Sequence, residues 1–221
     1  MIHMSRSSIS DGVSSLFIIL YTFMVINEEI LLNNGAVIQE YEAGETIFLE
    51  DSLPKYYFQI RAGLVKLNTY REDGSEFIHS LPSDGHCFAE TFLWCNTGYC
   101  FNAVVISDSV IIRMIKSDFM NMVDRNKDLM QNLLHHNAER MFYRHKMLTT
   151  LSINNPSQRI YKVLEFLKMH HQVNEPFKFE VPLSRQQIAN LTGLRVETVI
   201  RTVKKLEHEN LVCISNGRIC L

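Results

Sequence analysis

Residues 184–206 read SRQQIANLTGLRVETVIRTVKKL, and this stretch predicts two short helices joined by a tight turn. Ser184 and Gln187 have the spacing of a capping box at the start of the first helix. Gly193 suits a left-handed turn position, and the second helix is expected from about Val196 to His208. Apolar residues recur at helical spacing and would form a shared core: Ile188, Leu191, Leu194, Val199, Val203 and Leu206. Two such helices with a glycine-bearing turn are typical of a helix-turn-helix.

The other face of the second helix carries polar and charged residues that suit contact with DNA: Arg195, Glu197, Thr198, Arg201, Lys204 and Lys205. An arginine can fork onto the O6 and N7 atoms of guanine, and a glutamate can accept from the N4 amine of cytosine. Glu197 and Arg201 are four residues apart and therefore project from one face. The alternative is a solvated face with an ordinary ion pair between these two residues. The capping box, the glycine and the cations together favour a recognition helix.

The chain ends in NLVCISNGRICL, residues 210–221, which predicts a β-hairpin after the second helix. Asn216-Gly217 between two apolar runs is a strong signal for a two-residue turn. A hairpin in this position would be a wing, and Arg218 near its tip could contact a phosphate. The turn would place Cys213 opposite Cys220. We expect a reduced thiol pair there, although the spacing also leaves a disulfide open.

Upstream, from about Gly35 to Lys116, short apolar runs recur every 8–12 residues between turn-forming pairs that contain glycine. This spacing predicts a sandwich, a barrel or a jelly roll. The segments YYFQI and LVKLNTY are read as two strands separated by Ala62-Gly63. The whole chain is therefore expected to be of the α+β class, with a β-roll before the helical part.

Residues 117–153 predict one long helix, because glycine and proline are absent from Lys116 to Leu151. Its apolar seam has the 4-3-4-3 spacing of a helix pair between two subunits: Leu134, Ala138, Met141, His145 and Leu148. Packing of this helix on its own domain is the alternative. Asn154-Asn155-Pro156 ends the pattern. The predicted domains are thus 1–116 (an N-terminal segment and the β-roll), 117–153 (the dimerisation helix) and 154–221 (the winged helix-turn-helix).

Composition, charge and cysteine content limit the possible classes of protein further. Of the 221 residues, 46% are hydrophobic, which is ordinary globular composition. Residues 154–221 carry a net charge of +4 and residues 1–153 a net charge of −6, so we expect only the C-terminal part to meet nucleic acid. The apolar run Leu16–Ile26 is too short to cross a bilayer and is expected to be buried. Five cysteines without a CxxC motif favour reduced thiols and a cytoplasmic protein.

These motifs resemble the CRP/FNR family of bacterial transcription regulators along residues 35–221. The resemblance rests on AGETIFLED, the YYFQIRAGLVKL segment, GHCFAETFLW, the long central helix, SRQQIANLTGLRVETVIR and the terminal hairpin. It implies that Glu197 and Arg201 read bases, that Ser184, Arg185 and Lys204 lie at the DNA backbone, and that a homodimer binds a palindromic operator. It also implies RNA polymerase as a partner, which some relatives touch through the loop that corresponds to Gln172–Pro176.

The β-roll of nucleotide-binding members carries a phosphate cassette, and the corresponding segments here are Phe88-Ala89-Glu90-Thr91 and Cys100-Phe101-Asn102-Ala103. The candidate effector pocket by this resemblance comprises Ala89, Glu90, Thr91, Phe101, Asn102, Arg144 and His145. Phe101 stands where the family has its phosphate-binding arginine, and a buried phosphate needs such a cation. We therefore expect no cyclic AMP, no cofactor, and either an unknown small-molecule effector or none. An iron–sulfur cluster is not expected either, because no cysteine precedes Cys87.

A competing hypothesis is an enzyme, in which a cupin-like jelly roll with a catalytic metal is fused to a helix-turn-helix. Such a metal needs several histidines and a carboxylate that converge on one point. His79, His86 and Glu90 are the candidates, but the expected His-x-His pair is missing. The sequence therefore favours a DNA-binding regulator without a metal.

Overall fold

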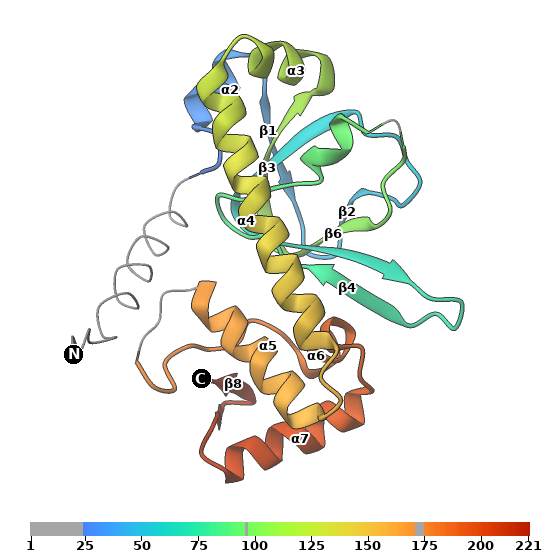
Figure 1. Cartoon of the computed structure of the whole chain (residues 1–221), viewed down its shortest axis with the longest axis vertical. Coiled ribbons are helices and arrows are strands. Elements are labelled where there is room, and N and C mark those ends of the chain that lie inside the picture. Colours follow the sequence, from blue (N-terminus) through green and yellow to red (C-terminus); the bar gives the residue numbers. More distant parts are fainter. Residues whose placement is uncertain (1–23, 96, 171–174) are drawn as a thin grey trace, which may run out of the picture.

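A computed structural model describes residues 24–95, 97–170 and 175–221 of the chain (Figure 1). Residues 16–23 of the predicted apolar run Leu16–Ile26 lie outside this range, and so does most of the predicted polymerase-contacting loop Gln172–Pro176. An antiparallel β-roll comes first, a long helix runs beside it, and a helical domain with a small hairpin follows (Figure 1). The expected α+β class and the order of its parts are confirmed.

The β-roll is built around its two longest strands, which pair antiparallel with each other. The six-stranded sheet has the order β1-β6-β3-β4, with β2 paired to β6 and β5 paired to β3. Its elements are helix α2 (Glu28–Asn33), β1 (Val37–Tyr41), β2 (Thr46–Phe48), β3 (Tyr56–Tyr70), β4 (Glu76–Ser80), β5 (Cys87–Phe88), the short 3-10 helix η1 (Glu90–Leu93) and β6 (Asn102–Ile115).

The expected turn at Ala62-Gly63 is wrong, because β3 runs through it as one strand of 15 residues. The register of β3 against β6 shifts on both sides of Ala62, so the glycine marks a bulge and not a chain reversal. Gly63 has φ of +117°, and a Cβ atom there would lie 2.0 Å from the Ser109 Oγ. Glycine is thus required by close packing within a bent strand.

The predicted single helix over 117–153 is also wrong in its first part. Two helices form instead, α3 (Lys116–Asp124) and α4 (Lys127–Leu151). Asn126 separates them with φ of −131° and ψ of 98°, and its side chain accepts hydrogen bonds from the backbone N–H groups of Asp128 and Leu129. An asparagine that caps a new helix therefore breaks the run where no glycine or proline is present.

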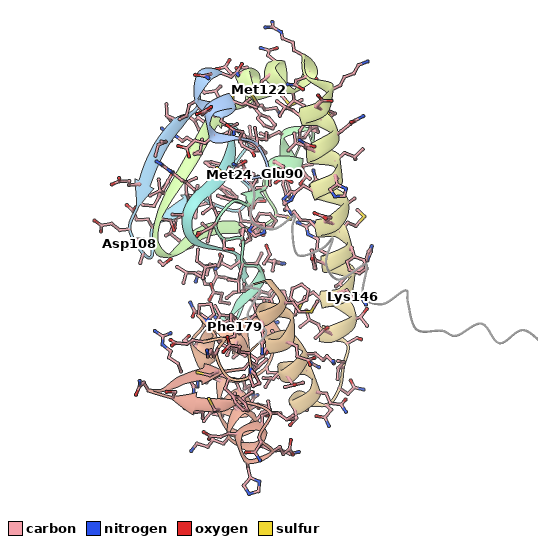
Figure 2. All side chains as sticks on the ribbon, turned by 90° about the vertical axis from the view of Figure 1, so that its left-hand side faces the viewer. Met24, Glu90, Asp108, Met122, Lys146 and Phe179 are labelled. Carbon is pink, nitrogen blue, oxygen red and sulfur yellow. The ribbon has the colours of Figure 1, made fainter. Side chains whose placement is uncertain are left out.

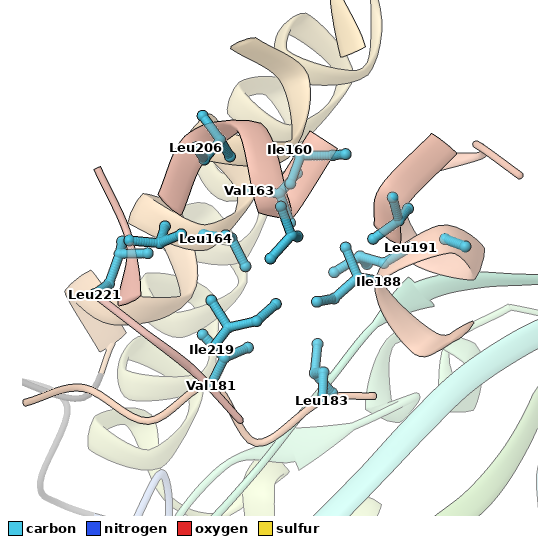
Figure 3. Close-up of a cluster of buried hydrophobic side chains, with 14 of the residues drawn as sticks. Ile160, Val163, Leu164, Val181, Leu183, Ile188, Leu191, Leu206, Ile219 and Leu221 are labelled. Carbon is cyan, nitrogen blue, oxygen red and sulfur yellow. The ribbon is translucent and has the colours of Figure 1, made fainter. Parts of the chain in front are cut away.

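The C-terminal domain contains the predicted helix-turn-helix and wing. Its elements are α5 (Pro156–His170), α6 (Arg185–Thr192), α7 (Val196–His208), β7 (Cys213–Ser215) and β8 (Arg218–Cys220). The capping box of Ser184 and Gln187 is present, and Gly193 ends α6 with φ of +67°. The expected core residues are buried, with Leu194 partly buried against them, and they pack with α5 and the hairpin strands (Figure 3).

The β3–β4 hairpin joins the β-roll to this domain. Ile78 in β4 is 1% exposed and belongs to the hydrophobic core of the C-terminal domain. Glu76 accepts a 2.6 Å hydrogen bond from the Asn190 amide on α6, while its other oxygen pairs with Lys66. The first helix of the helix-turn-helix is therefore held by both apolar and polar contacts from the β-roll.

Candidate functional site

The outward face of α7 presents the predicted base-reading residues to solvent. Glu197 and Arg201 are exposed, whereas Val199 and Val203 on the opposite face are buried in the domain core. In the described part of the chain no ion pair joins the Glu197 carboxylate to the Arg201 guanidinium. The structure therefore does not show the ion pair that was the alternative to a recognition helix. Both groups are available to a partner molecule.

The other residues predicted to contact DNA surround this face. Ser184, Arg195, Lys204 and Arg218 are exposed, and Arg185 and Thr198 are partly exposed: these six come from the start of α6, the start and middle of α7 and the hairpin. Arg185 donates a hydrogen bond to the Gly217 carbonyl, which ties α6 to the hairpin turn. The Arg218 Nε atom lies 3.5 Å from the Glu180 Oε1 atom. The hairpin and the two helices therefore form one connected cationic surface.

The seam predicted on the long helix is exposed along α4. The exposed fractions of Leu134, Met141 and Leu148 are 70%, 62% and 64%. Ala138 and His145, which complete the seam, are exposed as well. A row of apolar side chains of this size on one helix is unusual at a surface that remains in water.

An ion pair between the fully buried Glu90 carboxylate, which is labelled in Figure 2, and the Arg140 guanidinium anchors α4 to the β-roll. Glu90 has 0% exposure, and both of its carboxylate oxygens accept from the Arg140 Nη1 atom at 2.6 Å. Burial alone would raise the pKa of Glu90, but the Arg140 charge and hydrogen bonds hold that pKa below its ordinary value. Sequence reasoning did not find Arg140, although it lies on the same helix face as the candidate Arg144, one turn earlier.

The residues predicted for an effector pocket do not line one common cavity. The Asn102 side chain makes structural hydrogen bonds and is not available to a ligand. It accepts from the Glu50 N–H and donates to the Asn68 carbonyl. Phe101 is buried among other aromatic rings, with its centroid 5.4 Å from that of Phe92. Ala89 is buried in a left-handed conformation with φ of +57°, and it leads into the helix that carries Glu90 and Thr91.

A cavity of about 170 Å³ lies instead between the β-roll, α4 and the C-terminal domain. Arg144 is the one predicted effector residue that lines it, and His145 does not. Its cationic wall is Arg140 and Arg144, and its apolar wall includes Phe88, Met147, Phe166 and Leu191. Phe166 lies on α5 and Leu191 on α6, so the cavity borders directly on the helix-turn-helix.

His136 lies in the wall of this cavity and is poorly placed to carry a charge. Burial and the positive charge of Arg140 lower its pKa to about 4, although Glu90 acts in the opposite direction. Its Nε2 atom is buried without a hydrogen-bond partner in the described part of the chain. The ring is therefore neutral in the folded protein at neutral pH.

We expect acid to destabilise the fold through His136. The unfolded chain binds a proton on this ring near pH 6.5 and the folded chain only near pH 4, so this contribution to stability is complete above pH 6.5 and is lost as the pH falls toward 4. Between pH 7 and pH 5 the loss should be about 1–2 kcal/mol. Urea unfolding of His136→Asn should show a shallower pH dependence than wild type.

His135→Asn is the matched control, because His135 is the exposed neighbour on the same helix and pairs with Glu139 at 3.3 Å. This variant should keep the wild-type pH dependence. If His136→Asn kept the wild-type pH dependence of stability, the loss of stability in acid could not be attributed to His136.

The three candidate metal ligands of the enzyme hypothesis have other partners or lie apart. Glu90 is paired with Arg140, and the His79 Nε2 atom lies 3.1 Å from the Thr69 hydroxyl. The His86 Nδ1 atom lies 3.1 Å from the Ser83 carbonyl oxygen. Across residues 24–95, 97–170 and 175–221, no three His, Cys, Asp or Glu side chains are grouped so that they could hold a metal ion.

No helix in the described part of the chain is both long enough and apolar enough to span a bilayer.

Both the β-roll and the C-terminal domain match known protein-family models. Residues 38–126 match the model of the cyclic nucleotide-binding domain, and residues 158–221 match that of the Crp-like helix-turn-helix domain. The nitrogen fixation regulation protein FixK of Bradyrhizobium diazoefficiens is 25% identical over 190 residues, which cover 82% of this chain and 76% of that protein. The cAMP-activated global transcriptional regulator CRP of Pasteurella multocida is 25% identical over 178 residues, or 79% of this chain and 85% of that protein.

Solved structures share the fold. FixK2 from Bradyrhizobium japonicum superposes with a TM-score of 0.73 at 22% identity, over 84% of this chain and 91% of that one. The c-di-GMP responsive global regulator CLP of Xanthomonas campestris superposes with a TM-score of 0.75 at 16% identity, over 87% of this chain and 96% of that one. The FixK and CRP relatives carry the names of regulators, so the comparisons do not support the enzyme hypothesis.

Proposed function

Because this chain belongs to the CRP/FNR family of transcription regulators, we propose that it binds a two-fold symmetric operator as a homodimer and reads it with Glu197 and Arg201. The observation that carries this proposal is that these two side chains are exposed on α7, one helical turn apart, and form no ion pair with any residue that the structure describes. The Arg201 guanidinium would donate to a guanine and the Glu197 carboxylate would accept from a cytosine in the major groove.

The surrounding cations hold the domain on the DNA backbone in this proposal. Arg185, Lys204 and Arg218 contact phosphates with Ser184 beside Arg185, while Arg195 and Thr198 lie at the edge of the groove. Such contacts set position and affinity but carry no sequence information. The net charge of +4 on residues 154–221 supports this proposal of phosphate contacts around the base-reading residues.

The proposal is tested by selecting duplexes from a random-sequence pool with the purified full-length protein. The expected result is a palindrome whose half-sites lie about one helical turn apart, bound with an affinity that falls steeply with salt. Enrichment of no sequence, or of a single asymmetric half-site, would refute the symmetric operator.

The exposed seam of α4 is the proposed dimer interface. Burial of Leu134, Met141 and Leu148 against the same residues of a second copy would remove their apolar surface from water. We expect the double variant Leu134→Glu/Leu148→Glu to sediment as a monomer at concentrations where wild type is a dimer. Asn132→Glu adds a charge to an exposed position on the other side of this helix and should remain dimeric. A dimeric double variant would move the interface elsewhere.

RNA polymerase is a further proposed partner, since a regulator bound at a promoter acts through polymerase. A role in transcription also supports a location in the bacterial cytoplasm, where the chromosome lies. Transcription from a promoter that carries the selected operator, with and without the protein, would establish whether the effect is activation or repression.

We further infer that the effector of this regulator is a small organic anion and that it binds in the cavity beside α4. Arg140 and Arg144 both line the cavity. The Glu90 carboxylate neutralises only the Arg140 charge, so the lining keeps the positive charge of Arg144. The remaining wall is mainly apolar. A cavity of 150 Å³ in another protein holds benzene, so about 170 Å³ fits one ring with a carboxylate.

Benzoate is the probe for this site, and its uncharged analogue benzamide is the control ligand. Benzoate should raise the melting temperature of wild type but not that of Arg144→Ala, and benzamide should have less effect. No shift with either compound would refute the site, and an equal shift with both would refute its preference for an anion.

A further inference from the structure

Two cysteines face each other in the terminal hairpin, and neither has a role in the DNA contacts proposed above. Cys213 on β7 is directly opposite Cys220 on β8, and the strands are joined by the two-residue turn Asn216-Gly217. Ile214 and Ile219 point into the domain core. Because side chains alternate along a strand, both thiols lie on the other face of the hairpin together with Arg218.

The two thiols are free in the structure, and we propose that they form a reversible disulfide when the protein meets a low-molecular-weight disulfide such as oxidised glutathione. Directly opposed residues of a hydrogen-bonded antiparallel pair have Cα atoms about 5.5 Å apart, which is within the range that a disulfide spans. Their Cβ atoms are about 4.5–5.5 Å apart, slightly more than a relaxed disulfide allows. Such a strained bridge is easily reduced, as a regulatory disulfide must be.

The exchange proceeds in two steps. Cys213 is partly exposed, so its thiolate attacks the oxidised glutathione, forms a mixed disulfide and releases one glutathione thiol. Cys220 is 7% exposed, loses its proton to solvent and attacks the Cys213 sulfur, which releases the second glutathione thiol. Burial, the neighbouring Cys213 thiol and the Glu180 carboxylate raise the pKa of Cys220, which suits a resolving thiol better than an attacking one.

The bridge would act on the part of the domain that holds the DNA backbone. β8 also pairs with the preceding segment, through hydrogen bonds between Val181 and Ile219 and between Phe179 and Leu221. The Glu180 carboxylate from that segment holds Arg218, and the Gly217 carbonyl holds Arg185. Drawing the two strands together at the thiols therefore displaces both cations, and the expected loss of operator affinity is about tenfold. This consequence rests on the proposed function, whereas formation of the disulfide does not.

The disulfide is tested by peptide mass analysis of the full-length protein after oxidised glutathione and blocking of the remaining thiols. Trypsin cuts after Lys205 and Arg218, so the two cysteines fall on separate peptides, residues 206–218 and 219–221. We expect one joined species that is two hydrogens lighter than the sum and that separates with dithiothreitol. Full blocking of both thiols, stable glutathione adducts alone, or links to the exposed Cys95 or Cys100 would overturn the proposal.

Its effect on DNA is measured separately, with a duplex selected from a random pool by the reduced protein. In a Cys95→Ser/Cys100→Ser background, oxidation should weaken binding about tenfold and dithiothreitol should restore it. Cys213→Ser in the same background should bind equally well before and after oxidation. A joined peptide with unchanged affinity would refute the regulatory effect, and a failed selection would count against the proposed function and not against the disulfide.

Discussion

Arg201→Ala is expected to abolish tight operator binding. A bidentate contact between arginine and guanine discriminates against other bases by about 1–3 kcal/mol. A symmetric dimer makes the contact in both half-sites, so the total loss is about 2–6 kcal/mol, or about 30-fold to about 10⁴-fold in affinity. Arg201 is exposed on α7 and no ion pair within the described residues involves it, so the fold should be unaffected. Fluorescence anisotropy with a labelled duplex measures the loss.

Lys204→Ala is the matched control for this experiment, because Lys204 lies on the same helix and is also exposed. A lost phosphate contact should weaken binding to every sequence alike and lower the salt dependence by about one unit per protomer. Arg201→Ala should instead relax the preference at one base pair of each half-site. Equal losses on matched and mismatched duplexes in both variants would contradict base reading by Arg201.

Arg140→Ala is expected to produce the largest loss of folding stability, about 3–5 kcal/mol. The reason is that the substitution leaves the Glu90 carboxylate at 0% exposure without its cation. Urea unfolding at pH 7 measures the loss. Replacing both partners with leucine removes the unpaired charge, so Glu90→Leu/Arg140→Leu should recover much of the stability.

Arg144→Ala serves as the control for Arg140→Ala, since it removes an arginine one turn further along α4 that makes no ion pair in the described part of the chain. Its effect on stability should stay within about 1 kcal/mol.

Acid should act on the Glu90–Arg140 pair in the same direction as the Arg140→Ala substitution. The pKa of Glu90 is lowered by Arg140, so the stability from this pair is present at neutral pH and is lost as the pH falls through that lowered value. A stable Arg140→Ala would mean that Glu90 takes up a proton or finds another partner.

The helix-turn-helix was predictable because its signals are local. Ser184 and Gln187 cap a helix three residues apart, Gly193 adopts the left-handed conformation that its missing side chain allows, and Asn216-Gly217 closes a two-residue turn. Each of these features depends on atoms a few residues away. The period of the apolar residues then determines which face of α7 is buried and which is exposed to solvent.

Errors arose where a local signal has two structural outcomes. Glycine after Ala62 is compatible with a turn or with a bulge, and only the pairing of β3 with β6 decides between them. Asn126 is compatible with a helix interior or with a cap, and packing of α3 against the β-roll decides for the cap. Both choices depend on partners far away in the sequence.

The sequence by itself determined the class of protein, the exposed polar face of α7 and the exposed seam of the long helix, because backbone capping and hydrophobic periodicity act over one or two helical turns. Tertiary structure alone decided that Glu90 is paired with Arg140, 50 residues away, and that the cavity lies beside Arg144 and against α5 and α6. The physical reason is that desolvation and charge pairing depend on which surfaces meet. Spacing along the chain carries no information about that meeting.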